Sequence, residues 1–334
     1  MTKGLFAGFA LNLASTNPLI AQENLISWSG DLEIGFDGTI SSGDPASEFT
    51  DNYASLETSF EAGLAHGVAL FGTLTLESVI DPTDTRHFED IGLYVSALGL
   101  EFEFAHSHLK LGKINPTFAI AWDAAPGFYG TSLAEDYELN EAIGVTLDTP
   151  LQGTDGTLSM AVFYADDTGL SDSFGVRRGR NITAHGGAGN TGKLNNVALQ
   201  YLHIHEDSTY WIGGRFLTAS KVDVSDELGA VVGMAHSFDN GFDIIFEIAH
   251  FDGFAGGATN VTYTTVGSSY AHGPWEYSAS FTGMRDSAAG HDHVVSIGLD
   301  YLHENDIAIG GGVALYNVAG VKSTAIGASV VVPF

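Results

Sequence analysis

Five carboxylates capable of steering or binding cations are concentrated in one stretch of the chain, residues 114–141. This stretch has neither Lys nor Arg, and no helical or strand period runs through it. An irregular insert of this length inside a compact domain is usually functional. We therefore predict that function depends on its acidic side chains, which are Asp123, Glu135, Asp136, Glu138 and Glu141.

The histidines raise the question of a metal site. Three pairs of histidines are each separated by a single residue, so that both members project from one side of a strand. Two imidazoles supply too few ligands for a stable site, and the three pairs belong to different parts of the chain. We expect no metal and no other cofactor. The pairs are His106 with His108, His203 with His205, and His291 with His293.

Motifs for enzymatic chemistry are missing from the sequence. Serine hydrolysis needs a nucleophile, a base and an orienting acid in contact, and no G-x-S-x-G or comparable motif occurs. The Gly-rich tract at 185–192 lies in a polar segment, 167–193, that also holds Arg177, Arg178 and Arg180. A phosphate-binding glycine loop would have to open a helix, and no helical pattern follows. We predict a long surface loop at 167–193 and no enzyme.

The composition favours strands and argues against some partners. The 334 residues include 41 acidic and 12 basic side chains, which give a formal net charge of -29 and argue against binding to nucleic acid. Gly is frequent at 42, Pro is rare at 8, Cys is absent, and aromatic residues make up 11 %. This mixture is typical of many short strands joined by tight turns. Because no linker divides the chain, one domain is expected over 22–334.

Residues 1–21 are predicted to be an export signal. The segment M-T-K-G-L-F-A-G-F-A-L-N-L-A combines one cation with an apolar run of the length of a signal h-region. A buried N-terminal helix is the alternative, although the segment lacks a polar face. No other apolar run reaches the roughly 18 residues that suggest a membrane-spanning helix.

Alternation of apolar and polar residues dominates the chain from Trp28 onward. Such alternation marks strands with one apolar and one polar face. Most of the runs approach the roughly ten residues that a tilted strand needs to cross a bilayer. About sixteen runs occur, at 28–38, 53–64, 67–80, 89–104, 107–114, 141–149, 157–166, 194–205, 209–220, 226–238, 241–252, 259–271, 274–284, 291–302, 306–317 and 322–334.

The connections differ at the two ends of these predicted strands. After even-numbered runs the chain turns within a few residues, as at 65–67, 239–241 and 272–274, whereas the connections after odd-numbered runs are usually longer and more polar. This asymmetry predicts an all-β fold, a transmembrane antiparallel up-and-down β-barrel of about 16 strands. A soluble β-sandwich shows the same alternation and is the alternative.

In such a barrel the apolar face meets lipid and the polar face lines the interior. Interior acids then outnumber interior cations, and we predict a preference for cations and small neutral solutes over anions. For any single acid, a solvated rim position is the alternative. Arg215 either opposes the acidic insert or pairs with a carboxylate on a neighbouring strand. Lys113 shares a phase with Leu109 and is left unassigned. The predicted wall residues are Arg215, Lys110, Glu57, Glu101, Glu103, Asp243 and Glu247.

The last predicted strand resembles the closing strand of Gram-negative outer-membrane barrels. It runs from Lys322 through S-T-A-I-G-A-S-V-V-V-P-F and ends on Phe334. Together with about sixteen strands and a long insert after the fifth, this ending makes residues 28–334 similar to the general, trimeric porin family. The segments W-D-A-A-P-G-F-Y-G and A-E-D-Y-E-L-N-E-A-I-G resemble a branch of alphaproteobacterial porin-like proteins.

The resemblance implies a constriction loop, an assembly signal and an oligomer. It implies that residues 114–141 fold inward, that Phe334 belongs to the signal read by the barrel-assembly machinery, and that the protein forms homotrimers in the outer membrane. Within the insert we expect the apolar residues 118–122 to pack on the wall while the later carboxylates stay in contact with water.

The predicted function is passive diffusion of small hydrophilic solutes and ions through an outer-membrane porin. Its partners would be outer-membrane lipid and lipopolysaccharide, to which the cations of 167–193 could bind, besides the assembly machinery. A porin specific for a sugar or oligosaccharide is one alternative, because Trp122, Phe128 and Tyr129 could stack on a sugar ring. A secreted or surface β-sandwich that acts in binding or adhesion is the alternative of another class.

Overall fold

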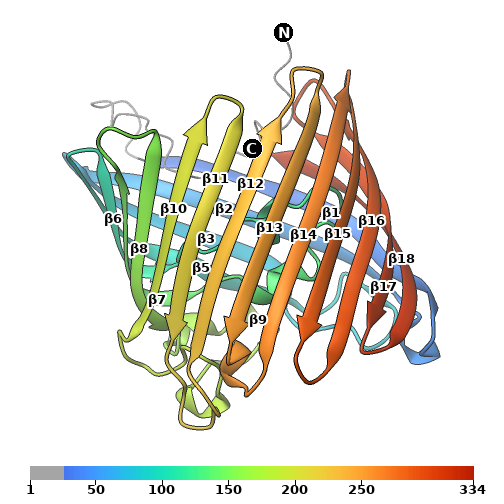
Figure 1. The fold of residues 1–334 in the computed structure, drawn as a ribbon, viewed down its shortest axis with the longest axis horizontal. Helices are drawn as coiled ribbons and strands as arrows, with labels where there is room; N and C mark the ends of the chain where they lie inside the picture. The colour runs from blue at the N-terminus through green and yellow to red at the C-terminus, as the bar shows by residue number, and fades with distance from the viewer. Residues whose placement is uncertain (1–25) are drawn as a thin grey trace.

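The computed structural model describes residues 26–334, so the predicted export signal at 1–21 lies outside the described residues. Sixteen long strands form one closed antiparallel sheet (Figure 1). They are β1 (Ile26–Ser42), β2 (Thr50–Ala65), β3 (Val68–Ser78), β5 (Ile91–Phe104), β6 (Ser107–Ile114), β7 (Ala142–Pro150), β8 (Gly156–Ala165), β10 (Asn196–His205), β11 (Ser208–Leu217), β12 (Glu227–Ser237), β13 (Phe242–Asp252), β14 (Asn260–His272), β15 (Trp275–Asp286), β16 (Gly290–Leu302), β17 (Ala308–Val318) and β18 (Val321–Pro333).

The sheet closes between its first and last strands. β1 pairs with β18, with Leu32 opposite Val332, and the backbones of Gly30 and Phe334 exchange hydrogen bonds of 3.1 and 2.9 Å. Closure leaves the wall without free edges, which is how barrels avoid unpaired strands. The predicted antiparallel barrel of about sixteen strands is therefore confirmed, and a single closed sheet excludes the two-sheet sandwich.

Short turns lie at one end of the barrel and most long connections at the other (Figure 1). The hairpin between β12 and β13 has Gly241 at a φ of 81°, the left-handed conformation that favours glycine in a tight turn. The long end carries the connections 79–90, 115–141 and 166–195, although 287–289 and 319–320 at this end are short. Two strands of two residues, β4 (Arg86–His87) and β9 (Phe174–Gly175), pair with β2 and β5 there.

Apolar side chains remain exposed on the outward face of the wall. Ile212, Ile297 and Leu315 are 59 %, 62 % and 55 % exposed. The rings of Trp275 and Tyr301, beside the short turns, meet edge to face at 4.8 Å. A band of exposed apolar residues with aromatic residues near its edge is the surface that a barrel presents to lipid.

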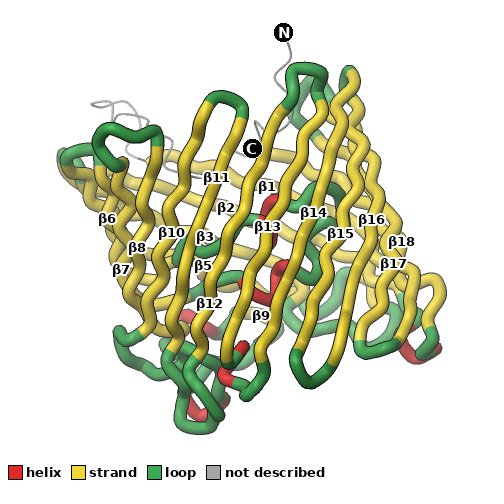
Figure 2. The backbone as a smooth tube through the Cα atoms, in the orientation of Figure 1, coloured by secondary structure: helices red, strands yellow, loops and turns green. Residues whose placement is uncertain are grey.

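The helices are short and belong to the connections. They are α1 (Ala121–Ala124) and the 3-10 helices η2 (Pro45–Ser47), η3 (Ala134–Tyr137), η4 (Gly169–Ser171), η5 (Thr183–His185) and η6 (Phe254–Gly256). Within residues 26–334 none of the helices is long and apolar enough to cross a membrane. Figure 2 shows helices of the insert within the ring of strands.

Candidate functional site

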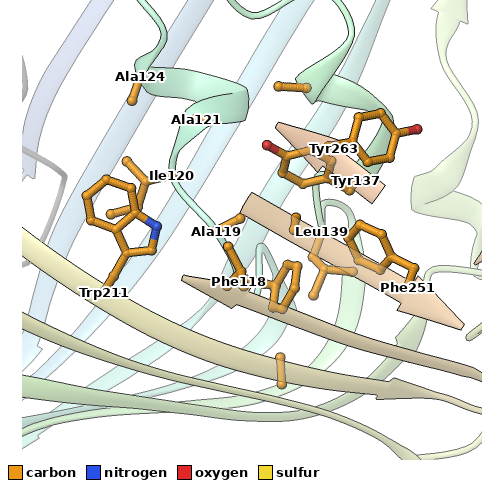
Figure 3. Packing of buried hydrophobic residues seen from close by; sticks show 14 of the residues in the cluster. Phe118, Ala119, Ile120, Ala121, Ala124, Tyr137, Leu139, Trp211, Phe251 and Tyr263 are labelled. Atoms are coloured by element: carbon orange, nitrogen blue, oxygen red, sulfur yellow. The ribbon is translucent and has the colours of Figure 1, made fainter. Parts of the chain in front are cut away.

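The insert between β6 and β7, residues 115–141, lies inside the barrel and packs against the inner wall. Phe118 and Tyr137 of the insert are each 1 % exposed, and they meet Phe251 of β13 and Tyr263 of β14 (Figure 3). The ring centroids of Phe118 and Phe251 are 5.9 Å apart, and those of Tyr137 and Tyr263 are 5.0 Å apart. Burial of these aromatic residues supplies much of the stabilisation that holds the insert against the wall.

Glu247 of β13 is the main polar anchor of the insert. Its Oε2 accepts hydrogen bonds from the backbone N–H of Ile120 at 2.8 Å and from Trp211 Nε1 at 2.6 Å. Its Oε1 accepts from the backbone N–H of Ala121 at 3.3 Å and from the Tyr137 hydroxyl at 2.7 Å. No side chain within α1 caps its first turn, and Glu247 binds the free N–H groups there instead. The wall acid at 247 therefore lies beneath the insert.

Arg215 of β11 is a second polar contact between wall and insert. Its Nε donates to Glu227 Oε1 of the neighbouring strand β12 at 2.6 Å, and its Nη1 donates to the carbonyl oxygen of Tyr137 at 2.6 Å. Its guanidinium lies over the rings of Phe118 and Phe251, at 4.8 and 4.4 Å from their centroids. Arg215 is only 4 % exposed. This geometry is that of the local ion pair, one of the two roles considered for this residue.

The middle of the insert contacts strands on both sides of the seam between β1 and β18. The Tyr129 hydroxyl donates to Asp37 Oδ1 of β1 at 2.5 Å, and Ser132 Oγ lies 3.1 Å from the Tyr316 hydroxyl of β17. A Cβ at Gly327 would lie 2.3 Å from the ring of Phe128, so glycine permits this close approach. The rings of Phe128 and Tyr129 are thus packed on the wall rather than presented to a solute.

Three carboxylates of the insert face the open interior. Asp123, Glu135 and Asp136 are exposed, and Glu138 is half-buried. On the facing wall Glu57 is exposed, and it lies close enough to Asp123 for the two to interact electrostatically. Asp31 and Glu77 of the wall act on Glu57 as well. The open path is therefore acidic on both sides.

Burial changes the protonation of the insert's carboxylates. Burial is the largest cause that raises the pKa of Glu138 to about 7, helped by Glu135 and Asp123 and opposed by a hydrogen bond from Asn140. The partial loss of water around Asp123 inside the barrel also raises the pKa of that carboxyl group, although the side chain stays in contact with the interior. Charged carboxylates in a partly dehydrated site titrate closer to neutral pH than in water, so Glu138 changes charge within the physiological range.

Glu141 lies at the long-loop end, between two cations. Lys113 Nζ lies 2.6 Å from its Oε2 and 2.9 Å from Asp166 Oδ2, and Arg178 Nη1 donates to its Oε1 at 2.8 Å. The guanidinium of Arg178 also lies 3.8 Å from the ring centroid of Tyr94. The charge of Glu141 is thus matched by its neighbours, unlike the charges of Asp123 and Glu135.

The remaining predicted wall residues lie away from the insert's carboxylates. Glu101 accepts from the His108 ring at 2.8 Å and lies 3.8 Å from Lys110 Nζ. Glu103 is exposed near a short turn, and Asp243 is 4 % exposed near another. Within the described part of the chain, no three His, Asp or Glu side chains are grouped to hold a metal ion.

Two contacts of the insert were not anticipated from the sequence. Gln200 Oε1 of β10 accepts from the backbone N–H of Ala119 at 2.6 Å, and Asn115 Oδ1 accepts from the backbone N–H of Glu141 at 2.9 Å. Gln200 is polar and on the interior face of its strand, which is the signal that could have indicated it. Nothing in the local sequence shows which backbone group it meets.

The barrel and its inward insert define the class as a porin-type fold. No family model matches the sequence, and no curated protein matches it. Solved structures of engineered variants of the porin of Rhodopseudomonas blastica are similar to this chain. A triple mutant aligns with 15 % identity over 92 % of this chain and 100 % of that chain, with a TM-score of 0.61. Another variant aligns with 16 % identity over the same shares, also with a TM-score of 0.61. The expected porin fold is thereby confirmed.

Proposed function

We propose that the protein is an outer-membrane porin that lets small hydrophilic solutes and ions diffuse passively, with a preference for cations. The insert would narrow the path, and the observation that carries the preference is the acidity of both sides of that path. Among the ion pairs formed within residues 26–334, none joins a Lys or Arg to Asp123, Glu135 or Glu57.

The size of the electrostatic effect supports selectivity. At an effective dielectric constant of about 20, a cation about 8 Å from one carboxylate is stabilised by about 2 kcal/mol. Several such carboxylates repel an anion by a comparable amount each. Salt screens these interactions with a Debye length of about 10 Å at 0.1 M, so the preference should be strongest in dilute salt.

The proposal includes a homotrimer in the outer membrane and recognition of Phe334 by the barrel-assembly machinery. These features follow from the resemblance of residues 28–334 to trimeric porins. Arg177 of the long loop is accessible, with 74 % of its side chain exposed, although it pairs with Asp172. Contact of this loop with lipopolysaccharide is part of the proposal. A sugar-specific porin has less support, since the rings of Phe128 and Tyr129 are packed on the wall.

Reversal potentials in planar bilayers under a potassium chloride gradient would test the proposal. We expect a potential of the sign for cation preference, which decreases when Asp123 and Glu57 are replaced together by Asn and Gln. Glu304→Gln, which removes an exposed carboxylate in a short turn, is the matched control and should leave the potential unchanged. A preference for anions, or no conductance at all, would refute the proposal.

A further inference from the structure

A cavity of 240 Å³ opens beside the insert at the long-loop end of the barrel. Its polar side includes Asp136 of η3 and two residues that follow the helix, Glu138 and Asn140. The side chains of Phe163 and Phe254 contribute to its apolar side. The cavity therefore offers carboxylates and aromatic rings to the same small volume.

The back of the cavity is held in place by an ion pair and a backbone contact. Glu227 binds Arg215 through Oε1, and its Oε2 accepts from the backbone N–H of Ala255 at 2.7 Å. Ala255 in the connection after β13 has a φ of 53°, a conformation that a non-glycine residue rarely adopts. The ring of Phe254 next to it packs on Phe251 with centroids 5.1 Å apart. These contacts hold the back wall of the cavity in place.

The charges that line the cavity do not cancel. Glu227 matches the charge of Arg215 at 2.6 Å. Asp136 has a neutral partner, the Tyr263 hydroxyl at 2.9 Å, and Glu138 has another, the amide of Asn140 at 3.1 Å. Two carboxylates are left without a cation, in a site whose other walls are mostly apolar.

We propose that this cavity binds a small organic cation, a primary ammonium ion whose apolar body has the size of a single ring. The ammonium group donates hydrogen bonds to the carboxylate of Glu138, which has the amide of Asn140 but no cation beside it, because charge-assisted bonds to carboxylates are the strong ones. The apolar body lies against Phe163 and Phe254, where aromatic rings also attract a nearby cation. The ion pair of Arg215 and Glu227 stays intact and forms the back wall of the site.

The proposal deepens the proposed function by naming a class of solute. The role of a bound cation in transport rests on the proposed porin function, whereas the binding itself does not depend on that function. A site at the long-loop end would concentrate organic ammonium ions beside the path before they pass the insert. Inorganic cations are the less suitable occupants because they cannot use the apolar wall.

Calorimetric titration of the purified barrel in detergent tests the binding with three probes of one shape: cyclohexylammonium, cyclohexanol and cyclohexanecarboxylate. We expect one site for cyclohexylammonium, at least about tenfold tighter than for cyclohexanol, and no binding of the carboxylate. Glu138→Gln removes one negative charge and leaves the shape of the side chain nearly unchanged. It should weaken cyclohexylammonium binding about tenfold. Glu304→Gln, a change in an exposed short turn far from the cavity, should leave the affinity unchanged.

A second variant tests the volume rather than the charge. Ala188→Phe places a ring in the cavity from the long loop and should abolish binding while all carboxylates remain. Heat-modifiable mobility in gels checks that each variant is folded. Equal affinity for the ammonium ion and the alcohol, or full affinity in Glu138→Gln, would overturn the inference. A protein that conducts ions but does not bind the ammonium ion overturns this inference alone, whereas binding without conductance overturns the proposed function.

Discussion

Replacement of Glu247 by Gln should loosen the insert without changing the wall. The carboxylate of Glu247 accepts four hydrogen bonds from Ile120, Ala121, Tyr137 and Trp211, two at each oxygen. Glutamine has nearly the same shape but only one oxygen, so two of these donors would face an amide nitrogen that also donates. The insert therefore loses bonds at the start of α1, where the backbone N–H groups have no other partner.

The expected loss follows from the kind of bond. A hydrogen bond to a charged group contributes about 1.5–3 kcal/mol, and the bonds that remain become neutral and weaker. We expect the free energy that holds the insert against the wall to decrease by about 2–4 kcal/mol in total, while the packing of the aromatic rings is unchanged. That free energy raises the ratio of displaced to anchored insert about 30- to 1,000-fold. Displacement should appear as frequent changes of current through a single channel.

Single-channel recording in planar bilayers would measure this change. Glu247→Gln should show current fluctuations that are rare in the unchanged protein, with normal heat-modifiable mobility. Glu57→Gln is the matched control, because it removes the same charge from the interior wall without touching the insert. If Glu247→Gln has the conductance and the current noise of the unchanged protein, the carboxylate does not anchor the insert.

Three further predictions concern charge, pairing and shape. The pKa of Glu138 is raised to about 7, so this carboxyl group is charged above that pH and neutral below it. Cation selectivity, measured by reversal potential, should therefore fall as the pH decreases from about 8 to about 6. A Glu138→Gln variant that keeps this pH dependence would contradict the assignment. Arg215→Met leaves Glu227 buried without a cation and should cost about 3–5 kcal/mol of the free energy of unfolding, seen as a lower guanidinium midpoint. Adding Glu227→Gln should recover most of that loss, and an unchanged midpoint in the single variant would refute the pairing. Gly267→Val should push Pro126 of the insert away from the wall, because a Cβ at Gly267 would lie 2.4 Å from Pro126 Cδ. Conductance should therefore change although no charge is altered. Unchanged conductance would show that this contact does not set the position of the insert.

The wall could be predicted from the sequence because its signal is local. Alternation assigns each residue to one face, and it places Phe246 outward and Glu247 inward from neighbouring letters alone. The structure agrees, with Phe246 38 % exposed and Glu247 buried. The positions of the turns follow from the same local pattern, since glycine and asparagine mark them.

The environment of each inward residue could not be predicted in the same way. Glu57 and Glu247 have the same polar phase, yet Glu57 faces the open interior whereas Glu247 is covered by the insert. The difference depends on the path of residues 115–141, which is set by contacts between distant parts of the chain. Lys113 shows a second limit, because its partners Glu141 and Asp166 lie in connections whose paths the alternation does not give.

The contacts that hold the insert also suggest when it reaches its place. Its hydrogen bonds join residues far apart in the chain: 81 positions separate Ala119 from Gln200, and 184 separate Ser132 from Tyr316. Contacts over such separations form late, because the chain between them must first be ordered. The wall strands that the insert touches include the last two of the chain, β17 and β18. We therefore expect the insert to dock only after the late strands that it touches are ordered, so that the interior is for a time wider than in the finished protein.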